Sequence, residues 1–79
     1  MNFILTFPSI HKVLKAENIL KDKGISFRLN PAPPSLAAFC DLVITVSEAS
    51  FPGANAALIA VKLKPKAVYR AEGEAYVKV

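Results

Sequence analysis

The stretch ISFRLNPAPPSLAAFCDLVITV, residues 25–46, decides the fold, because it places two strand patterns in succession with no helix between them. Residues 25–30 alternate apolar and polar side chains, which is the period of a strand with one buried face. Residues 40–46 are rich in β-branched side chains and indicate a second strand. The connection, residues 31–39, contains three prolines, which keep it extended and prevent it from forming a helix. The central strand-to-strand connection therefore indicates a mainly antiparallel sheet.

A strand and a helix precede this stretch. Residues 2–7 are apolar and partly β-branched, and a proline follows them, so we expect a short buried strand. Ser9 can accept a hydrogen bond from a free backbone N–H group at the start of the helix of residues 10–23. Gly24 ends that helix, because glycine readily takes the left-handed conformation of a helix C-terminus.

A second helix and strand follow the stretch. Ser47 or Ser50 is expected to cap a helix over residues 54–64, whose lysines in the last turn complement the helix dipole. The sequence KAVYRA then predicts the last core strand. Residues 71–79 alternate again and predict a tail that is either an edge strand or a strand exchanged with a partner.

The order of elements is β-α-β-β-α-β, which predicts an α+β protein. We expect a ferredoxin-like sandwich, with a mixed, mainly antiparallel sheet and both helices on one face. Right-handed crossovers leave few alternatives. Residues 1–70 form the predicted single domain, and residues 71–79 form the tail.

The composition favours a small intracellular protein that associates with itself or with a partner. The chain has 79 residues, of which 53% are hydrophobic, and this is a high share for so small a body. The single cysteine excludes an internal disulfide and fits a reducing cytoplasm. Neither a signal peptide nor a membrane span is visible, so we expect a cytoplasmic protein without a membrane partner.

The net charge of +4 raises the question of nucleic-acid binding. Only Arg28 and Arg70 are arginines, and no aromatic-basic motif accompanies the lysines. Solvated helix faces explain the lysines, so no nucleic-acid partner is expected. The positive excess is expected at most to attract an acidic partner or an anionic substrate.

Cys40 is the first candidate for chemistry. Its thiol would be a nucleophile only as the thiolate, and the loop in front of it offers backbone N–H groups and solvent access. Pro31, Pro33 and Pro34 restrict that loop and lower its entropy. Asp41 would lower the reactivity of this thiol, because a neighbouring carboxylate disfavours the thiolate. The alternative is that Cys40 is a small buried hydrophobic residue that opens a strand.

Glu17 is the second candidate, because it falls inside the apolar arc of the first helix. That arc consists of Ile10, Val13, Leu14, Ala16 and Leu20. A carboxylate there must find a partner, and the loop backbone, His11 or Arg28 could supply one. The alternative is that Glu17 extends from the edge of the arc into water.

His11 lies in the first turn of the same helix, outside the apolar arc. Histidine exchanges protons near neutral pH, so His11 could move a proton, or it could be an ordinary surface residue. One cysteine and one histidine do not make a metal site within one chain, and no metal or cofactor is expected. The dinucleotide-binding, Walker, CxxC, HExxH and nucleophile-elbow patterns are absent.

Taken together, these residues resemble a small bacterial family of selenium/sulfur carrier-like proteins. The stretch FPSIHKVLKAENILKDKGI, residues 7–25, resembles the opening helix of that family. The matching positions are Ser9, His11, Ala16, Glu17, Gly24 and Ile25. The family continues with a Pro-x-Pro strand end and a cysteine seven residues later, which Pro31, Pro33 and Cys40 match. Asp41 stands where the family usually has glycine.

The resemblance implies a carrier rather than a true enzyme. Cys40 would take a persulfide or selenopersulfide from a cysteine desulfurase-like donor and pass it to an acceptor protein. Ser9, His11 and Glu17 would support the thiol, and Pro31, Pro33 and Pro34 would shape its loop. Two alternatives stay open: a non-catalytic interaction or regulatory module, which could be a homo-oligomer, and a sensor of small anions near Ser9.

Overall fold

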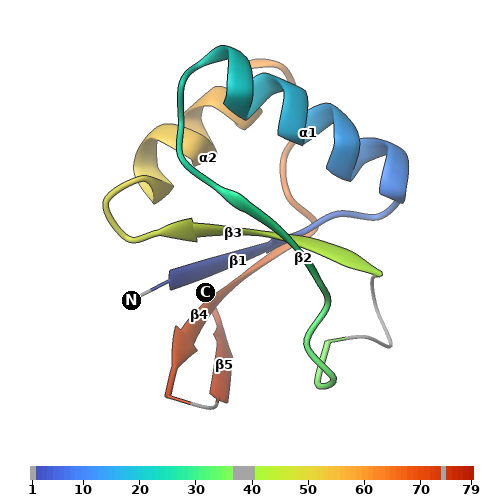
Figure 1. The fold of residues 1–79 in the computed structure, drawn as a ribbon, viewed down its shortest axis with the longest axis vertical. Helices are drawn as coiled ribbons and strands as arrows, with labels where there is room; N and C mark the ends of the chain where they lie inside the picture. Colours follow the sequence, from blue (N-terminus) through green and yellow to red (C-terminus); the bar gives the residue numbers. More distant parts are fainter. Residues whose placement is uncertain (1, 37–40, 74) are drawn as a thin grey trace.

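The computed structural model describes residues 2–36, 41–73 and 75–79, which form five strands and two helices (Figure 1). The elements are β1 Asn2–Thr6, α1 Ile10–Asp22, β2 Arg28–Pro31, β3 Leu42–Ser47, α2 Phe51–Ala60, β4 Ala67–Glu72 and β5 Ala75–Lys78. The protein is therefore α+β, as the sequence predicts. None of its described helices is long and apolar enough to cross a membrane.

The five strands form one sheet in the order β2-β3-β1-β4-β5. β2 pairs directly with β3, and the tail strand β5 pairs with β4 at the edge. All neighbouring strands in the described chain are antiparallel, whereas a mixed sheet was expected. The reason is that each helix joins two strands that have a third strand between them, so the strands that run parallel are not neighbours.

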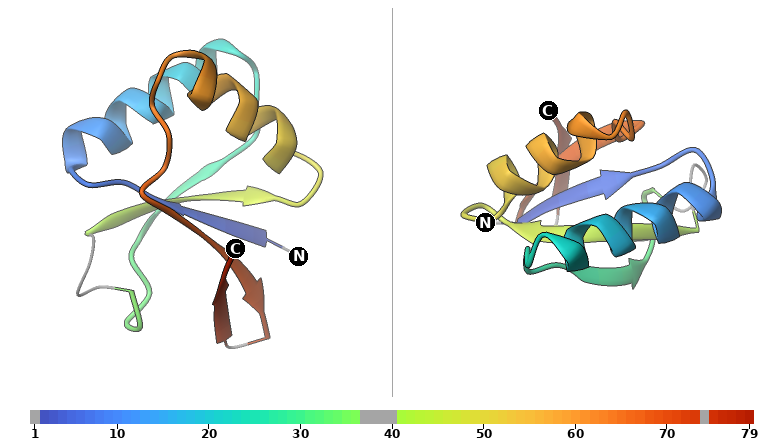
Figure 2. Two further views of the ribbon diagram at one scale, coloured as in Figure 1. Left: turned by 180° about the vertical axis from the view of Figure 1, so that it is seen from behind. Right: turned by 90° about the horizontal axis from the view of Figure 1, so that it is seen from above.

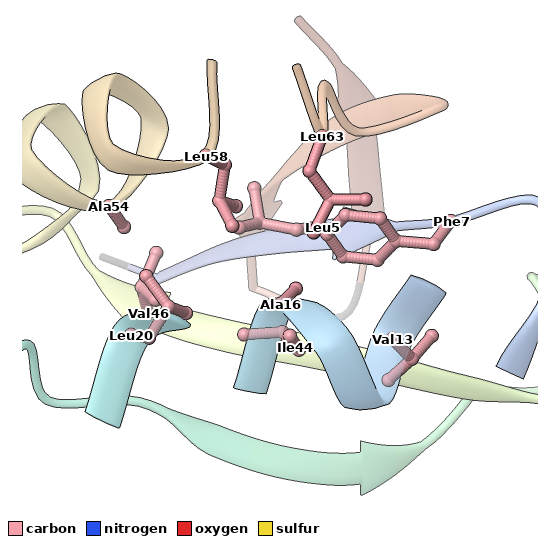
Figure 3. Close-up of a cluster of buried hydrophobic side chains, with 10 residues drawn as sticks. All are labelled: Leu5, Phe7, Val13, Ala16, Leu20, Ile44, Val46, Ala54, Leu58 and Leu63. Carbon is pink, nitrogen blue, oxygen red and sulfur yellow. The ribbon is translucent and has the colours of Figure 1, made fainter. Parts of the chain in front are cut away.

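Both helices cover one face of the sheet (Figures 1 and 2). The main core lies between the helices and this face. The buried side chains of this core are Leu5, Phe7, Val13, Ala16, Leu20, Ile44, Val46, Ala54, Leu58 and Leu63 (Figure 3). Helix α1 contributes residues at spacings of three and four, which is one side of a helix. At the border of the core, the rings of Phe3 and Phe51 stack with centroids 4.3 Å apart.

The strand predicted over residues 25–30 begins later than expected, at Arg28. The end of α1 explains the difference, because Gly24 takes a φ of 69° and the Ile25 N–H donates to the Leu20 carbonyl at 2.9 Å. Residue 25 thus completes the helix C-terminus instead of starting the ladder.

The second helix differs from its prediction at both ends. It begins at Phe51, and the Ser47 hydroxyl accepts from the Ser50 N–H at 3.2 Å in the turn before it. It ends at Ala60, and Lys62 has a positive φ of 61°. The prediction that lysines occupy its last turn was wrong, because the chain leaves the helix before it reaches them.

Replacing Leu58 by alanine tests the main core. Leu58 is fully buried, so the cavity left behind should lower the free energy of unfolding by about 2–5 kcal/mol. Urea denaturation measures this loss. Ile59→Ala is the matched control, because Ile59 is 50% exposed, and it should change the free energy by about 0.5 kcal/mol or less. Equal losses in both variants would contradict the assigned core.

Candidate functional site

The connection between β2 and β3 carries the candidate thiol. Cys40 itself lies outside the described residues, but the chain is described on both sides of it, to Leu36 and from Asp41. Pro31 lies opposite Leu42 as the last pair of the strand register. One further hydrogen bond, from the Ala32 N–H to the Asp41 carbonyl at 3.0 Å, extends this pairing into the connection. The connection therefore leaves and rejoins the sheet at a fixed point.

A turn follows that hydrogen bond. The Leu36 N–H donates to the Pro33 carbonyl at 2.8 Å, which closes a four-residue turn. Pro34 is the second residue of this turn, a position where the fixed φ of proline is already suitable. The three prolines thus have separate places, since Pro31 ends β2 while Pro33 and Pro34 build the turn.

Leu36 fixes the turn to the sheet. Its side chain is 5% exposed and forms a small cluster with Ile4 and Val43 on the face that the helices leave open. Ala32 and Tyr69 pack against this cluster. The first part of the connection, residues 32–36, is therefore folded back against the open face, and its stability depends on this second, smaller core.

Ser9 and His11 lie at the same end of the sheet as this connection. Leu5 of β1 pairs with Ile44 of β3 in antiparallel register, so the chain that leaves β1 for α1 passes beside the start of β3. Figures 1 and 2 show α1 and β3 beginning on the same side of the molecule. The Ser9 hydroxyl accepts from the Lys12 N–H at 3.4 Å, which confirms the predicted cap. His11 is exposed in the first turn.

Glu17 is placed differently. It lies in the middle of α1 with its side chain 23% exposed, and its Oε2 is 3.9 Å from the Nζ atom of Lys21. This partner is on the same helix, one turn further on, so the ion pair directs Glu17 along α1. Within the described residues no hydrogen bond or ion pair joins Glu17 to the loop, His11 or Arg28. The bracing role of Glu17 stays a prediction.

A groove of about 650 Å³ on the open face was not predicted from the sequence. It is lined by Asn2, Ile4, Ser26, Phe27, Arg28, Asn30, Thr45, Val46, Ser47, Ala71 and Tyr76. The signal existed in the alternation of β2 and β3, whose polar residues share this face, but the same pattern is typical of a solvated strand. Among the described residues of the lining, Arg28 is the one charged side chain.

The described residues contain no cluster of three or more His, Cys, Asp or Glu side chains that could hold a metal ion. The only carboxylate next to the candidate thiol in the sequence is Asp41, which is exposed at the start of β3. The chemistry that this end of the sheet could perform is therefore that of the thiol, the imidazole of His11 and nearby lysines.

A protein-family model described as "Putative Se/S carrier protein-like" matches residues 2–70. The match includes β1 to the middle of β4 and therefore both helices, the proline-rich connection and Cys40. No curated protein and no solved structure matches the chain.

Replacing Leu36 by alanine tests the anchoring of the connection. Loss of this buried side chain should lower the free energy of unfolding by about 2 kcal/mol and should release the turn that it holds. Hydrogen exchange of the Leu36 amide, which is bonded to Pro33, should then accelerate more than that of the β1 amides. In Leu58→Ala, by comparison, no selective effect on this amide is expected. Equal acceleration of all amides in both variants would exclude a separate anchor.

Proposed function

The chain belongs to this selenium/sulfur carrier-like family, and we propose that it carries sulfur or selenium on the thiol of Cys40. The observation that carries the proposal is the family match over residues 2–70. The fixed points at Asp41 and Leu36 support it, because they hold both sides of a connection that lies outside the strands. A carrier must offer its thiol in turn to two different proteins, and such a connection suits that task.

The proposed transfer is an exchange between a thiol and a persulfide. The Cys40 thiolate attacks the terminal sulfur of a persulfide on a cysteine desulfurase-like donor. The sulfur–sulfur bond of the donor breaks, the donor leaves as its thiolate, and a persulfide forms on Cys40. An acceptor then takes the terminal sulfur and returns Cys40 to its thiolate. No electron is gained or lost overall, so the chain needs no cofactor, and selenium would follow the same course. The chain is a carrier in this scheme rather than a true enzyme.

The other candidate residues have unequal support. His11 lies at the loop end of the sheet and is exposed, which suits a group that moves a proton to or from a thiol. Ser9 caps α1 and so supports the helix turn that contains His11. Pro31, Pro33 and Pro34 shape the connection. Glu17 forms an ion pair with Lys21 on the surface of α1, worth about 0.5 kcal/mol, and its role in bracing the loop rests on the resemblance alone.

We also assign the fold to the ferredoxin-like class and the protein to the cytoplasm. The fold assignment is supported by the two helices, each of which joins strands that flank a third strand. The cytoplasmic assignment is supported by the single cysteine, because a carrier thiol must stay reduced.

Sulfur loading tests the carrier role. Wild type and Cys40→Ser are incubated with cysteine and a cysteine desulfurase, and their intact masses are measured. Wild type should gain the mass of one sulfur atom and lose it on reduction, whereas Cys40→Ser should gain none. Cys40→Ser should also unfold at the same urea concentration, since serine changes one atom. An equal gain of mass by both proteins, or no gain by either, would contradict the proposal.

The second candidate function is a non-catalytic interaction module, in which Cys40 is a structural residue. Exposed apolar side chains favour it: Ile59 is 50% exposed, Val61 45% and Val79 68%. Such residues near a helix end and just after an edge strand suit self-association or a protein partner. The proposed homo-oligomer belongs to this candidate.

Alkylation of the native protein distinguishes the two functions. A carrier thiol should react with iodoacetamide at neutral pH nearly as fast in native as in urea-unfolded protein. A structural cysteine should react only after unfolding. The number of modified molecules over time, measured by intact mass, gives both rates. Slow native alkylation together with absent sulfur loading would favour the interaction module.

A further inference from the structure

The net positive charge of the protein lies at one end of the sheet, because the basic residues elsewhere are balanced by carboxylates. Five lysines, Lys12, Lys15, Lys62, Lys64 and Lys66, belong to the start of α1 and to the segment between α2 and β4, and all are exposed. Asp41 is the one carboxylate among the described residues of this end. The formal excess of four positive charges here equals the net charge of the whole chain.

The topology brings these lysines to one end of the sheet, although those of α1 and those after α2 are 47 or more residues apart in the sequence. Helix α1 begins at the end of β1, and the Lys66 N–H donates to the Thr6 carbonyl at 2.8 Å, so both segments meet where β1 ends. Figure 3 shows the same arrangement in the core, where Val13 and Leu63 lie on the side of Phe7, and Ala54 and Leu20 lie on the other. The connection that contains Cys40 leaves and rejoins the sheet at this end, between Pro31 and Leu42.

Three of the described carboxylates lie at the opposite end. Asp22 ends α1, Glu48 follows β3, and Glu72 ends β4, where its Oε1 is 2.9 Å from an Nη atom of Arg70. Glu17 is paired with Lys21. None of the five lysines at the loop end has an ion pair with a residue that the structure describes. Their field is therefore not neutralised locally, and it extends over about 10 Å at moderate salt.

We propose that this lysine-rich end is the docking surface for an acidic patch on the proteins that exchange sulfur with Cys40, an inference that rests on the proposed function. Charge complementarity accelerates the encounter of two proteins and orients them, which places the donor at the loop. A carrier must also leave its partner, and exposed lysines give fast, salt-sensitive contacts instead of tight ones. A nucleic acid is the less suitable occupant, because the described residues of this end include no arginine and no exposed aromatic ring.

Binding of a decaglutamate peptide tests the surface directly. Amide chemical shifts should change at the start of α1 and between α2 and β4, and the changes should fade as salt is added. The double variant Lys64→Glu/Lys66→Glu should lose this binding. Lys21→Glu/Lys23→Glu is the matched control, because it makes the same change of charge at the opposite end, and it should keep most of the binding. Equal loss in both variants, or shifts centred on the groove around Arg28, would overturn the proposal. Tighter binding of a short DNA duplex than of the peptide, lost in the first variant, would also overturn it.

The reactivity of Cys40 tests whether the field reaches the thiol. Iodoacetate and iodoacetamide form the same bond and differ in charge, so the ratio of their rates reports the potential at Cys40. This ratio should fall by about threefold or more at low ionic strength in Lys64→Glu/Lys66→Glu and stay near the wild-type value in Lys21→Glu/Lys23→Glu. An unchanged ratio in the first variant would overturn the proposal. If wild type accepts sulfur on Cys40 but the ratio does not respond, only this inference fails. If the ratio responds but Cys40 accepts no sulfur, the carrier function fails instead.

Discussion

The pairing of β1 between β3 and β4 is the constraint on which the rest of the structure depends. Leu5 lies near the end of this strand, opposite Ile44 on one side and Val68 on the other, and it is fully buried. Both neighbours run antiparallel to β1, so the end of β1 meets the starts of β3 and β4 at a single end of the sheet. The candidate thiol loop, the start of α1 and the lysines before β4 share that end for this reason.

The two faces of the sheet differ in how much apolar surface they bury. The helices bury the face of Leu5 and supply most of the stability, whereas the other face carries only the small cluster of Leu36, Ile4 and Val43. That cluster is nevertheless what fixes the proline-rich connection, so a few buried methyl groups position the proposed carrier loop. The groove around Arg28, with polar and apolar side chains in its lining, also lies on the open face. A partner that docks at the loop end can thus approach without disturbing the main core.

Much of the fold could be predicted from local patterns. The alternation of the strands, the cap at Ser9 and the glycine at the end of α1 each follow from one or a few neighbouring residues. The late start of β2 and the early end of α2 could not be predicted in this way. They depend on the hydrogen bond from the Ile25 N–H to the Leu20 carbonyl and on the positive φ of Lys62, and both reflect how the chain must turn to reach the sheet. For the site, Cys40 and its prolines could be found as candidates, whereas Lys21 was not among the partners expected for Glu17, because the choice of partner depends on how the two side chains lie along the helix surface.

By itself the sequence determined the α+β class, the order of the elements and the membership in a selenium/sulfur carrier-like family, because hydrophobic periodicity, caps and motif spacing are properties of short segments. Only the tertiary structure decided that the lysines at the start of α1 and those after α2 lie at the loop end, with Asp22, Glu48 and Glu72 at the opposite end. It also decided that Leu36 holds the connection against the open face. The physical reason is that strand order and register determine which distant segments are neighbours, and a one-dimensional pattern does not contain that information.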